Sequence, residues 1–238
     1  MGSIDAATVP SADHAATLGQ RLRHSTRALH RQAERSGYVA EILRGRAEPL
    51  GYALLLRNLH PAYATLEAAL AGAGGHPALA PLRHPPLQRA APLARDLTAL
   101  AGPDWHHTLP LLPAGARYAA AVAAAGGRDG VRLVGHAYVR YLGDLSGGQI
   151  LARLLARSLG LGQEALNFYE FGGDGTAPLE RRVRRAIDLV TGAAADLVLA
   201  EAALAFRLNI DLSRAVAVSA AGPRQSARPD AQAAPSSG

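Results

Sequence analysis

The chain has 238 residues, of which 49% are hydrophobic and 18% are charged, and its formal net charge is +6. A chain of this length can bury one sizeable core, so we expect a single domain. Cysteine is absent and all 25 basic residues are arginine, which excludes disulfides, iron–sulfur ligation, a cysteine nucleophile and lysine Schiff-base chemistry.

The basic charge permits an acidic partner, but the signals of particular partner classes are missing. Aromatic residues make up only 5% of the chain and no run of five basic residues occurs, so we do not expect nucleic-acid binding. The sequence has no stretch of about 18 uncharged apolar residues and no signal-peptide pattern at its N-terminus. We therefore expect a cytoplasmic protein without a membrane anchor.

Helical periodicity dominates the chain between two low-complexity ends. We expect tails over residues 1–17 and 221–238 and a helical domain over 18–215. Apolar spacing predicts a helix from 18 to 34 that is ended by Gly37, and another after Pro49 that bends at Pro61. Further helices are predicted at roughly 87–100, 113–125, 129–159, 163–169, 178–191 and 193–214. No short alternating runs indicate strands, so the predicted fold class is all-α.

Four polar side chains share one face of the first predicted helix. At 100° per residue, one line along the axis passes within about 40° of all four, namely Arg23, Arg27, His30 and Glu34. A ligand held at its centre by His30 would place anionic groups beside the arginines, as haem does with its iron and two propionates. Glu34 would fix the second ring nitrogen of His30. A solvated basic face with an incidental histidine is the alternative.

The other candidate segment is the predicted helix that contains Gly143, Gly147 and Gly148. Each glycine inside a helix costs about 1 kcal/mol relative to alanine, so three of them need a reason. Gly143 and Gly147 are four residues apart and form a strip without side chains, along which a flat ligand can lie. Asp144 at the rim of this strip can hold ordered water. Close packing against another helix is the alternative explanation.

Two segments resemble the biliverdin-producing haem oxygenases. Residues 140–149, RYLGDLSGGQ, resemble the distal-helix signature of that family, and residues 26–34, TRALHRQAE, resemble its proximal segment. Further similarity is spread over the C-terminal half, in residues 168–171 (FYEF), Arg184, Phe206 and residues 208–210 (LNI). The likeness is ordered along nearly the whole of residues 18–214.

The resemblance implies a single-domain, multi-helix bundle in which haem b lies between a proximal and a distal helix. His30 would be the axial ligand of the iron, with Glu34 as its partner. Asp144 would act on the reaction through water, and Gly143 and Arg140 would complete the catalytic site. The other haem-binding residues would be Arg23, Arg27, Tyr138 and Arg184 near the propionates, together with Gly147, Gly148, Phe206 and Asn209.

The implied activity is the oxidative cleavage of haem, as both cofactor and substrate, to biliverdin, CO and Fe2+. The reaction requires O2 and electrons. The electrons must come from an external donor, because the chain has no flavin or nicotinamide fingerprint and no cysteine for a cluster. We expect a ferredoxin or flavoprotein reductase to dock on the basic surface. A non-catalytic haem carrier or sensor on the same fold is the alternative function, and a basic helical adaptor without a cofactor is another.

Some positions depart from the family pattern. Glu180 falls at or beside a position where many relatives have a second basic residue, and it would repel a propionate. His60 stands where mammalian members have a tyrosine in the distal water network. We expect a structural or hydrogen-bonding role for His136, and His24 points off the face of His30. The remaining histidines are expected at the surface, namely His14, His76, His84, His106 and His107.

Overall fold

The computed structural model describes residues 16–127, 130–173 and 175–222, and all regular elements in these ranges are helical. The α-helices are α1 (Leu18–Arg35), α2 (Gly37–Leu43), α3 (Pro49–Gly72), α4 (Ala90–Ala101), α5 (Trp105–Thr108), α6 (Pro113–Ala125), α7 (Leu133–Leu159), α8 (Ala177–Asp188) and α9 (Ala193–Ala220). Short 3-10 helices are η1 (Pro77–Arg83), η2 (Pro85–Leu87), η3 (Gln163–Ala165) and η4 (Asn167–Tyr169). The predicted all-α fold class is confirmed.

The helix predictions were close, with differences that have local causes. The chain predicted as one helix at 163–169 forms η3 and η4 instead, because the Asp96 carboxylate binds the backbone N–H groups of Asn167 and Phe168 and fixes a turn there. Helix α3 continues through Pro61 to Gly72. The predicted tails lie outside the described residues except for 16–17 and 221–222, and Thr17 caps α1 through its hydroxyl.

The break after α1 is a tight turn, and a second helix that the sequence did not predict starts there. Gly37 has φ +65 and begins α2. A side chain at this glycine would meet the backbone of Ser213 on α9, so only glycine fits so close to that helix. The hydroxyl of Ser213 accepts a hydrogen bond from the N–H of Val39 at 3.1 Å, which holds the start of α2 on α9.

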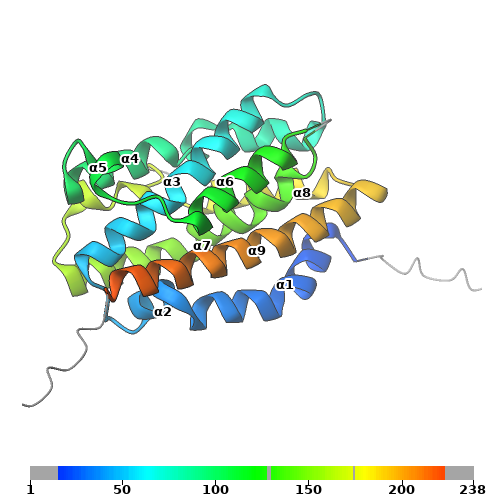
Figure 1. The fold of residues 1–238 in the computed structure, drawn as a ribbon. Coiled ribbons are helices and arrows are strands. Elements are labelled where there is room, and N and C mark those ends of the chain that lie inside the picture. Colours follow the sequence, from blue (N-terminus) through cyan, green and yellow to red (C-terminus); the bar gives the residue numbers. More distant parts are fainter. Residues whose placement is uncertain (1–15, 128–129, 174, 223–238) are drawn as a thin grey trace, which may run out of the picture.

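Helix α9 is the scaffold on which the site is built. It packs against both α1 and α7, and α7 also packs against α8 and α2. Figure 1 shows α9 in orange running between α1 in blue and the helices α3 and α6. Gly135 permits the close approach of α7, since a Cβ there would lie 2.9 Å from the backbone of α9. Within the described ranges, no helix is both long enough and apolar enough to cross a membrane.

Candidate functional site

A cavity of about 870 Å³ lies between α1 and α7, with further walls from α2, α3, α8 and α9. This volume suits a ligand of several hundred daltons. All the site residues predicted from the sequence line it except Gly148: Arg23, Arg27, His30, Glu34, Tyr138, Arg140, Gly143, Asp144, Gly147, Arg184, Phe206 and Asn209. The structure therefore brings together residues that are up to 186 positions apart in the chain, from Arg23 to Asn209.

The wall formed by α1 presents a half-exposed histidine with one nitrogen engaged. Nδ1 of His30 lies 3.5 Å from a carboxylate oxygen of Glu34, one turn further along the helix. This contact leaves Nε2 for a ligand in the cavity. The ring of Phe206 meets that of His30 edge-on with centroids 6.0 Å apart, so α9 supports the imidazole from the side. The amphipathic face predicted from the helical spacing is thus a wall of the cavity.

The wall formed by α7 carries the glycine strip. An added Cβ at Gly143 or at Gly147 would meet no atom within 4 Å outside the helix itself, so both positions border open space. Gly148 lies differently, because a Cβ there would come within 2.9 Å of the ring of Tyr169. Close packing therefore explains Gly148, whereas Gly143 and Gly147 leave a flat surface facing the cavity.

A buried polar network lies beside the strip. Arg140 donates hydrogen bonds from Nε to the Tyr63 hydroxyl at 3.0 Å and from one terminal nitrogen to Oδ1 of Asn209 at 2.5 Å. Its other terminal nitrogen lies 3.3 Å from Oδ1 of Asp144, and the Tyr63 hydroxyl donates to Oδ2 of the same carboxylate. Three helices, α3, α7 and α9, therefore hold one carboxylate in a fixed orientation.

The environment of Asp144 changes its acidity. Burial raises the pKa of Asp144 above the usual aspartate value, while the charges and hydrogen bonds of Arg140, Tyr63 and Arg89 oppose that rise. A carboxyl group with a raised pKa can hold or pass on a proton nearer to neutral pH than an exposed aspartate can. Asp144 is thus suited to supply protons inside the cavity.

Sequence analysis missed two residues that shape the site. Tyr63 completes the network, and its signal was a buried aromatic hydroxyl within the otherwise apolar core face of α3. Asp96 accepts three hydrogen bonds from Asn167 and Phe168, which fixes the η4 turn whose Phe168 and Tyr169 line the cavity. Its signal was a carboxylate at a core position of α4, next to Leu97 in the apolar pattern.

Tyr138 is tied to the opposite wall. The Thr26 hydroxyl donates to the carbonyl of Leu22 at 2.7 Å, so it must accept the hydrogen bond that joins it to the Tyr138 hydroxyl at 3.3 Å. The proton of Tyr138 is therefore directed at Thr26.

The two departures from the family pattern have structural explanations. Glu180 lies 3.5 Å from the Arg184 guanidinium in an i,i+4 pair on α8, and Arg184 lines the cavity while Glu180 does not. His60 does not belong to the distal network, where the tyrosine hydroxyl comes from Tyr63, one turn further along α3. The His60 ring packs edge-on against Trp105 instead, with centroids 5.2 Å apart.

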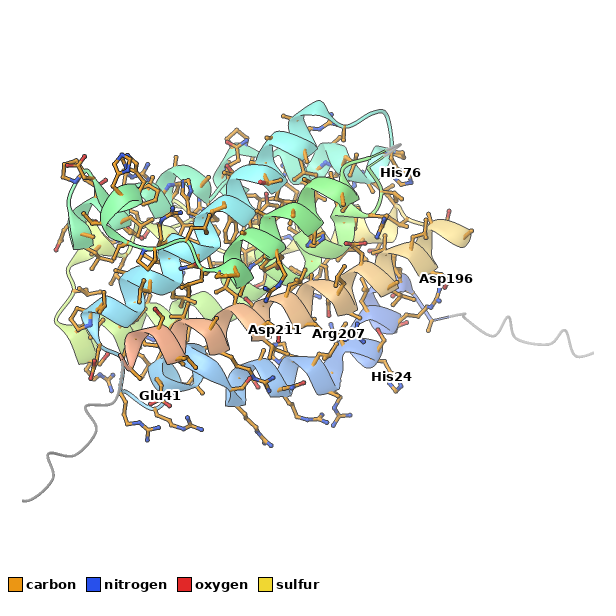
Figure 2. The ribbon with its side chains drawn as sticks, viewed as in Figure 1. His24, Glu41, His76, Asp196, Arg207 and Asp211 are labelled. Carbon is orange, nitrogen blue, oxygen red and sulfur yellow. The ribbon has the colours of Figure 1, made fainter. Side chains whose placement is uncertain are left out.

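The other histidines in the described part of the chain do not line the cavity. His136 is fully buried and its Nε2 lies 2.8 Å from a carboxylate oxygen of Glu201, which also binds Arg132 at 2.5 Å. This cluster joins α7 to α9 and matches the structural role that the sequence suggested. Figure 2 shows His24 on the outer side of α1, pointing away from the bundle. His14 lies outside the described residues.

The fold and the site define a class of all-helical proteins with a cavity between two helices, with a histidine on one wall and a buried carboxylate beside a bare glycine strip on the other. Comparison with known proteins gives the same result. The family described as "Heme oxygenase" matches residues 16–215. The heme oxygenase of Takifugu rubripes is 35% identical over 201 residues, which cover 82% of this chain and 72% of the relative. Heme oxygenase 1 of Synechocystis is 34% identical over 198 residues, 82% of each chain.

Solved structures agree with the sequence relatives. The crystal structure of Synechocystis heme oxygenase-1 in complex with heme superposes with a TM-score of 0.80 at 31% identity, covering 87% of this chain and 96% of that chain. The heme oxygenase of Leptospira interrogans gives a TM-score of 0.77 at 30% identity, covering 84% and 100%. The chain belongs to the haem oxygenase family, and its activity is the oxidative degradation of haem to biliverdin.

Proposed function

We propose that haem binds in the cavity between α1 and α7 with its iron on Nε2 of His30. The observation that carries this assignment is that His30 and the bare strip of Gly143 and Gly147 line the same cavity. Haem needs a nitrogen ligand on one face and a surface free of side chains against the other, and the residues present fit both needs. The solved complexes of the two Synechocystis relatives with heme support the proposal.

The basic side chains at the rim suit the propionates of haem. Arg23 and Arg27 on α1 and Arg184 on α8 line the cavity. Guanidinium groups form strong, often bidentate hydrogen bonds with carboxylates, so two propionates would be held between α1 and α8. Contacts on both sides would fix the rotation of the macrocycle about the iron, which decides the carbon at which the ring opens.

Bound haem supplies the iron at which O2 is reduced, and its own ring is the material oxidised to biliverdin with loss of CO and Fe2+. His30 holds the iron, and Glu34 keeps the imidazole oriented. Asp144 holds water above the strip and releases protons to it. Arg140 and Tyr63 fix the Asp144 carboxylate through hydrogen bonds, and Arg140 also lines the cavity.

The electrons come from a separate protein in this proposal. The chain has no cysteine for an iron–sulfur cluster, and its net charge of +6 favours an acidic donor such as a ferredoxin or a flavoprotein reductase. In this proposal the protein acts in the cytoplasm, where such a donor can reach it. A haem carrier or sensor remains the second candidate function, favoured only if bound haem persists under reducing conditions.

The test is a titration of the purified chain with haemin, followed by reduction under air. We expect a Soret band of histidine-ligated haem at one equivalent, then its loss and the appearance of biliverdin absorption after ascorbate or a ferredoxin system is added. Persistence of intact bound haem would leave the carrier function, and no Soret change on mixing would remove both candidates.

A further inference from the structure

A second, smaller chamber lies behind α7, on the side away from the glycine strip. Its volume is about 140 Å³, enough for several water molecules. Its polar lining comes from Glu67 on α3, from Arg83 and Gln88 near η1 and η2, and from Tyr141 on α7. Arg83 and Gln88 are exposed, so the chamber reaches the surface between them.

Tyr141 offers the chamber a hydroxyl that the protein itself does not use. Its side chain is fully buried, and the hydroxyl has no hydrogen-bond partner among the described residues. A buried polar group without a partner costs about 1–3 kcal/mol, and water in the chamber would remove that cost. Burial, and then the charge of Glu67, raise the pKa of Tyr141 far above the usual tyrosine value, so the hydroxyl keeps its proton.

Glu67 offers an acid at the same chamber. Its Oε1 accepts hydrogen bonds from the backbone N–H groups of Arg89 at 2.5 Å and of Ala90 at 2.9 Å, so a proton on Oε2 would disturb neither bond. Burial raises the pKa of Glu67 above the usual glutamate value, against the effect of these N–H groups and of the Arg89 charge. Arg83 and Tyr141 are the other titratable groups that line the chamber.

The chamber and the distal network lie one helical turn apart. On α3, Glu67 follows Tyr63 by four residues, and on α7, Tyr141 precedes Asp144 by three. One turn of an α-helix rises 5.4 Å. The pair of Glu67 and Tyr141 therefore lies about one turn along the two helices from the hydrogen-bonded pair of Tyr63 and Asp144. At 100° per residue, Tyr141 points about 160° away from Gly143. The pair of Glu67 and Tyr141 therefore faces the side of α7 that is opposite the haem cleft.

We propose that the chamber is the proton inlet of the enzyme, and that Glu67 and Tyr141 are positioning residues that relay protons from solvent to Asp144. A proton from water binds Oε2 of Glu67 and passes through chamber water to the Tyr141 oxygen, and Tyr141 releases its own proton through a second water to the Asp144 carboxylate, with which it makes no direct hydrogen bond. Each transfer forms one O–H bond and breaks another, and no group is oxidised or reduced. The inference rests on the proposed role of Asp144, because the haem reaction is what consumes the protons.

The test compares Tyr141→Phe and Glu67→Gln with the wild-type chain, all loaded with haem. Tyr52→Phe is the matched control, since it removes another fully buried tyrosine hydroxyl that lies outside the chamber. Biliverdin formation is followed in single turnover from pH 6 to 9, in H2O and in D2O. Haem affinity and the Soret position are measured for each variant, and the infrared carbonyl band that Glu67 gives on protonation is followed on the haem-free protein during titration with acid.

We expect Tyr141→Phe and Glu67→Gln to bind haem as the wild type does, but to turn over about 10-fold more slowly with a larger solvent isotope effect. Formate, which fits the chamber, should restore part of the rate of Glu67→Gln. Tyr141→Phe should shift the carbonyl band of Glu67, and Tyr52→Phe should leave band and rate unchanged.

Two results would overturn the relay while leaving the proposed function intact. One is wild-type turnover of Tyr141→Phe at every pH with an unchanged isotope effect. The other is an equal loss of rate in Tyr52→Phe, which would trace the loss to packing. A wild-type chain that binds haem without turnover would instead refute the proposed function together with the relay.

Discussion

The Tyr63 hydroxyl donates a hydrogen bond to Oδ2 of Asp144, so a residue of α3 sets the orientation of the carboxylate on α7. The same hydroxyl accepts from Nε of Arg140, which leaves it no freedom to rotate away. Tyr63→Phe should therefore let the carboxylate turn and raise the pKa of Asp144 further. We expect about a 10-fold loss of turnover, equivalent to one net hydrogen bond, with unchanged haem affinity. Single-turnover rates and haemin titration check this result, and an unchanged rate would contradict it.

Removing the carboxylate itself should separate haem binding from haem oxidation. Asp144→Ala and Asp144→Asn should keep the Soret band of the wild type, because His30 on the other wall is untouched. Turnover should fall about 100-fold or more in both, since the amide cannot release protons as the acid does. Spectra after reduction under air report the outcome, and wild-type-like biliverdin formation by either variant would exclude Asp144 from the reaction.

Loss of the imidazole should weaken the iron bond specifically. His30→Ala leaves the arginines of the cleft in place, so haem should still bind, but more weakly and with an altered Soret band. Added imidazole should restore the wild-type spectrum, because the space of the missing ring opens into the cavity. His24→Ala, on the exposed outer side of α1, is the control and should change neither property.

The two adjacent glycines Gly147 and Gly148 of α7 should respond differently to substitution by alanine. Gly147→Ala should stabilise the haem-free protein by about 1 kcal/mol through helix propensity and weaken haem binding, because the new methyl group projects into the cleft. Gly148→Ala should give no such gain, because its methyl group would press on Tyr169. Calorimetric melting of both haem-free variants measures the difference, and equal Tm values would refute the placement of the strip.

Glu201 should make stability depend on pH. Burial alone raises its pKa, but the hydrogen bonds and charges of His136 and Arg132 outweigh burial and hold the pKa below the usual glutamate value. The resulting stability is present above the usual value and is lost as the pH falls through the lowered one. Glu201→Gln should cost about 2 kcal/mol at pH 7 and progressively less below pH about 4.5. Urea unfolding at several pH values checks this, and a cost independent of pH would contradict it.

Most of the fold could be predicted from sequence periodicity, because helices bury one regular face. Apolar spacing identified α1, α3, α4, α6, α7, α8 and α9. It missed α2, because a seven-residue helix is too short to show a period and its start depends on how Gly37 fits against α9. It also took residues 163–169 as one helix, since the two turns there depend on the distant carboxylate of Asp96.

Site residues that lie on one helix could be predicted from the sequence. Contacts between residues on helices far apart in the sequence could not. The faces of α1 and α7 follow from spacing within each helix, which is why His30, Asp144 and the glycine strip were found. Tyr63 reaches Asp144 across 81 positions, and nothing in local spacing signals that contact. The exclusion of Gly148 from the cleft likewise depends on Tyr169, which belongs to the separate 3-10 helix η4.

The hydrogen bond between Tyr138 and Thr26 limits the width of the cleft and therefore the thickness of the molecule that can enter it. Thr26 is almost fully buried on α1, so the bond ties the two walls together at the inner side of the cleft, while the bare glycines leave the wall on the α7 side smooth. Because the two walls are held at a fixed separation, the thickness of a molecule decides whether it can enter the cleft. The charge at its edge matters only after it has entered. Porphyrins of other metals should therefore enter as readily as haem, and a bulky anion of equal charge should not.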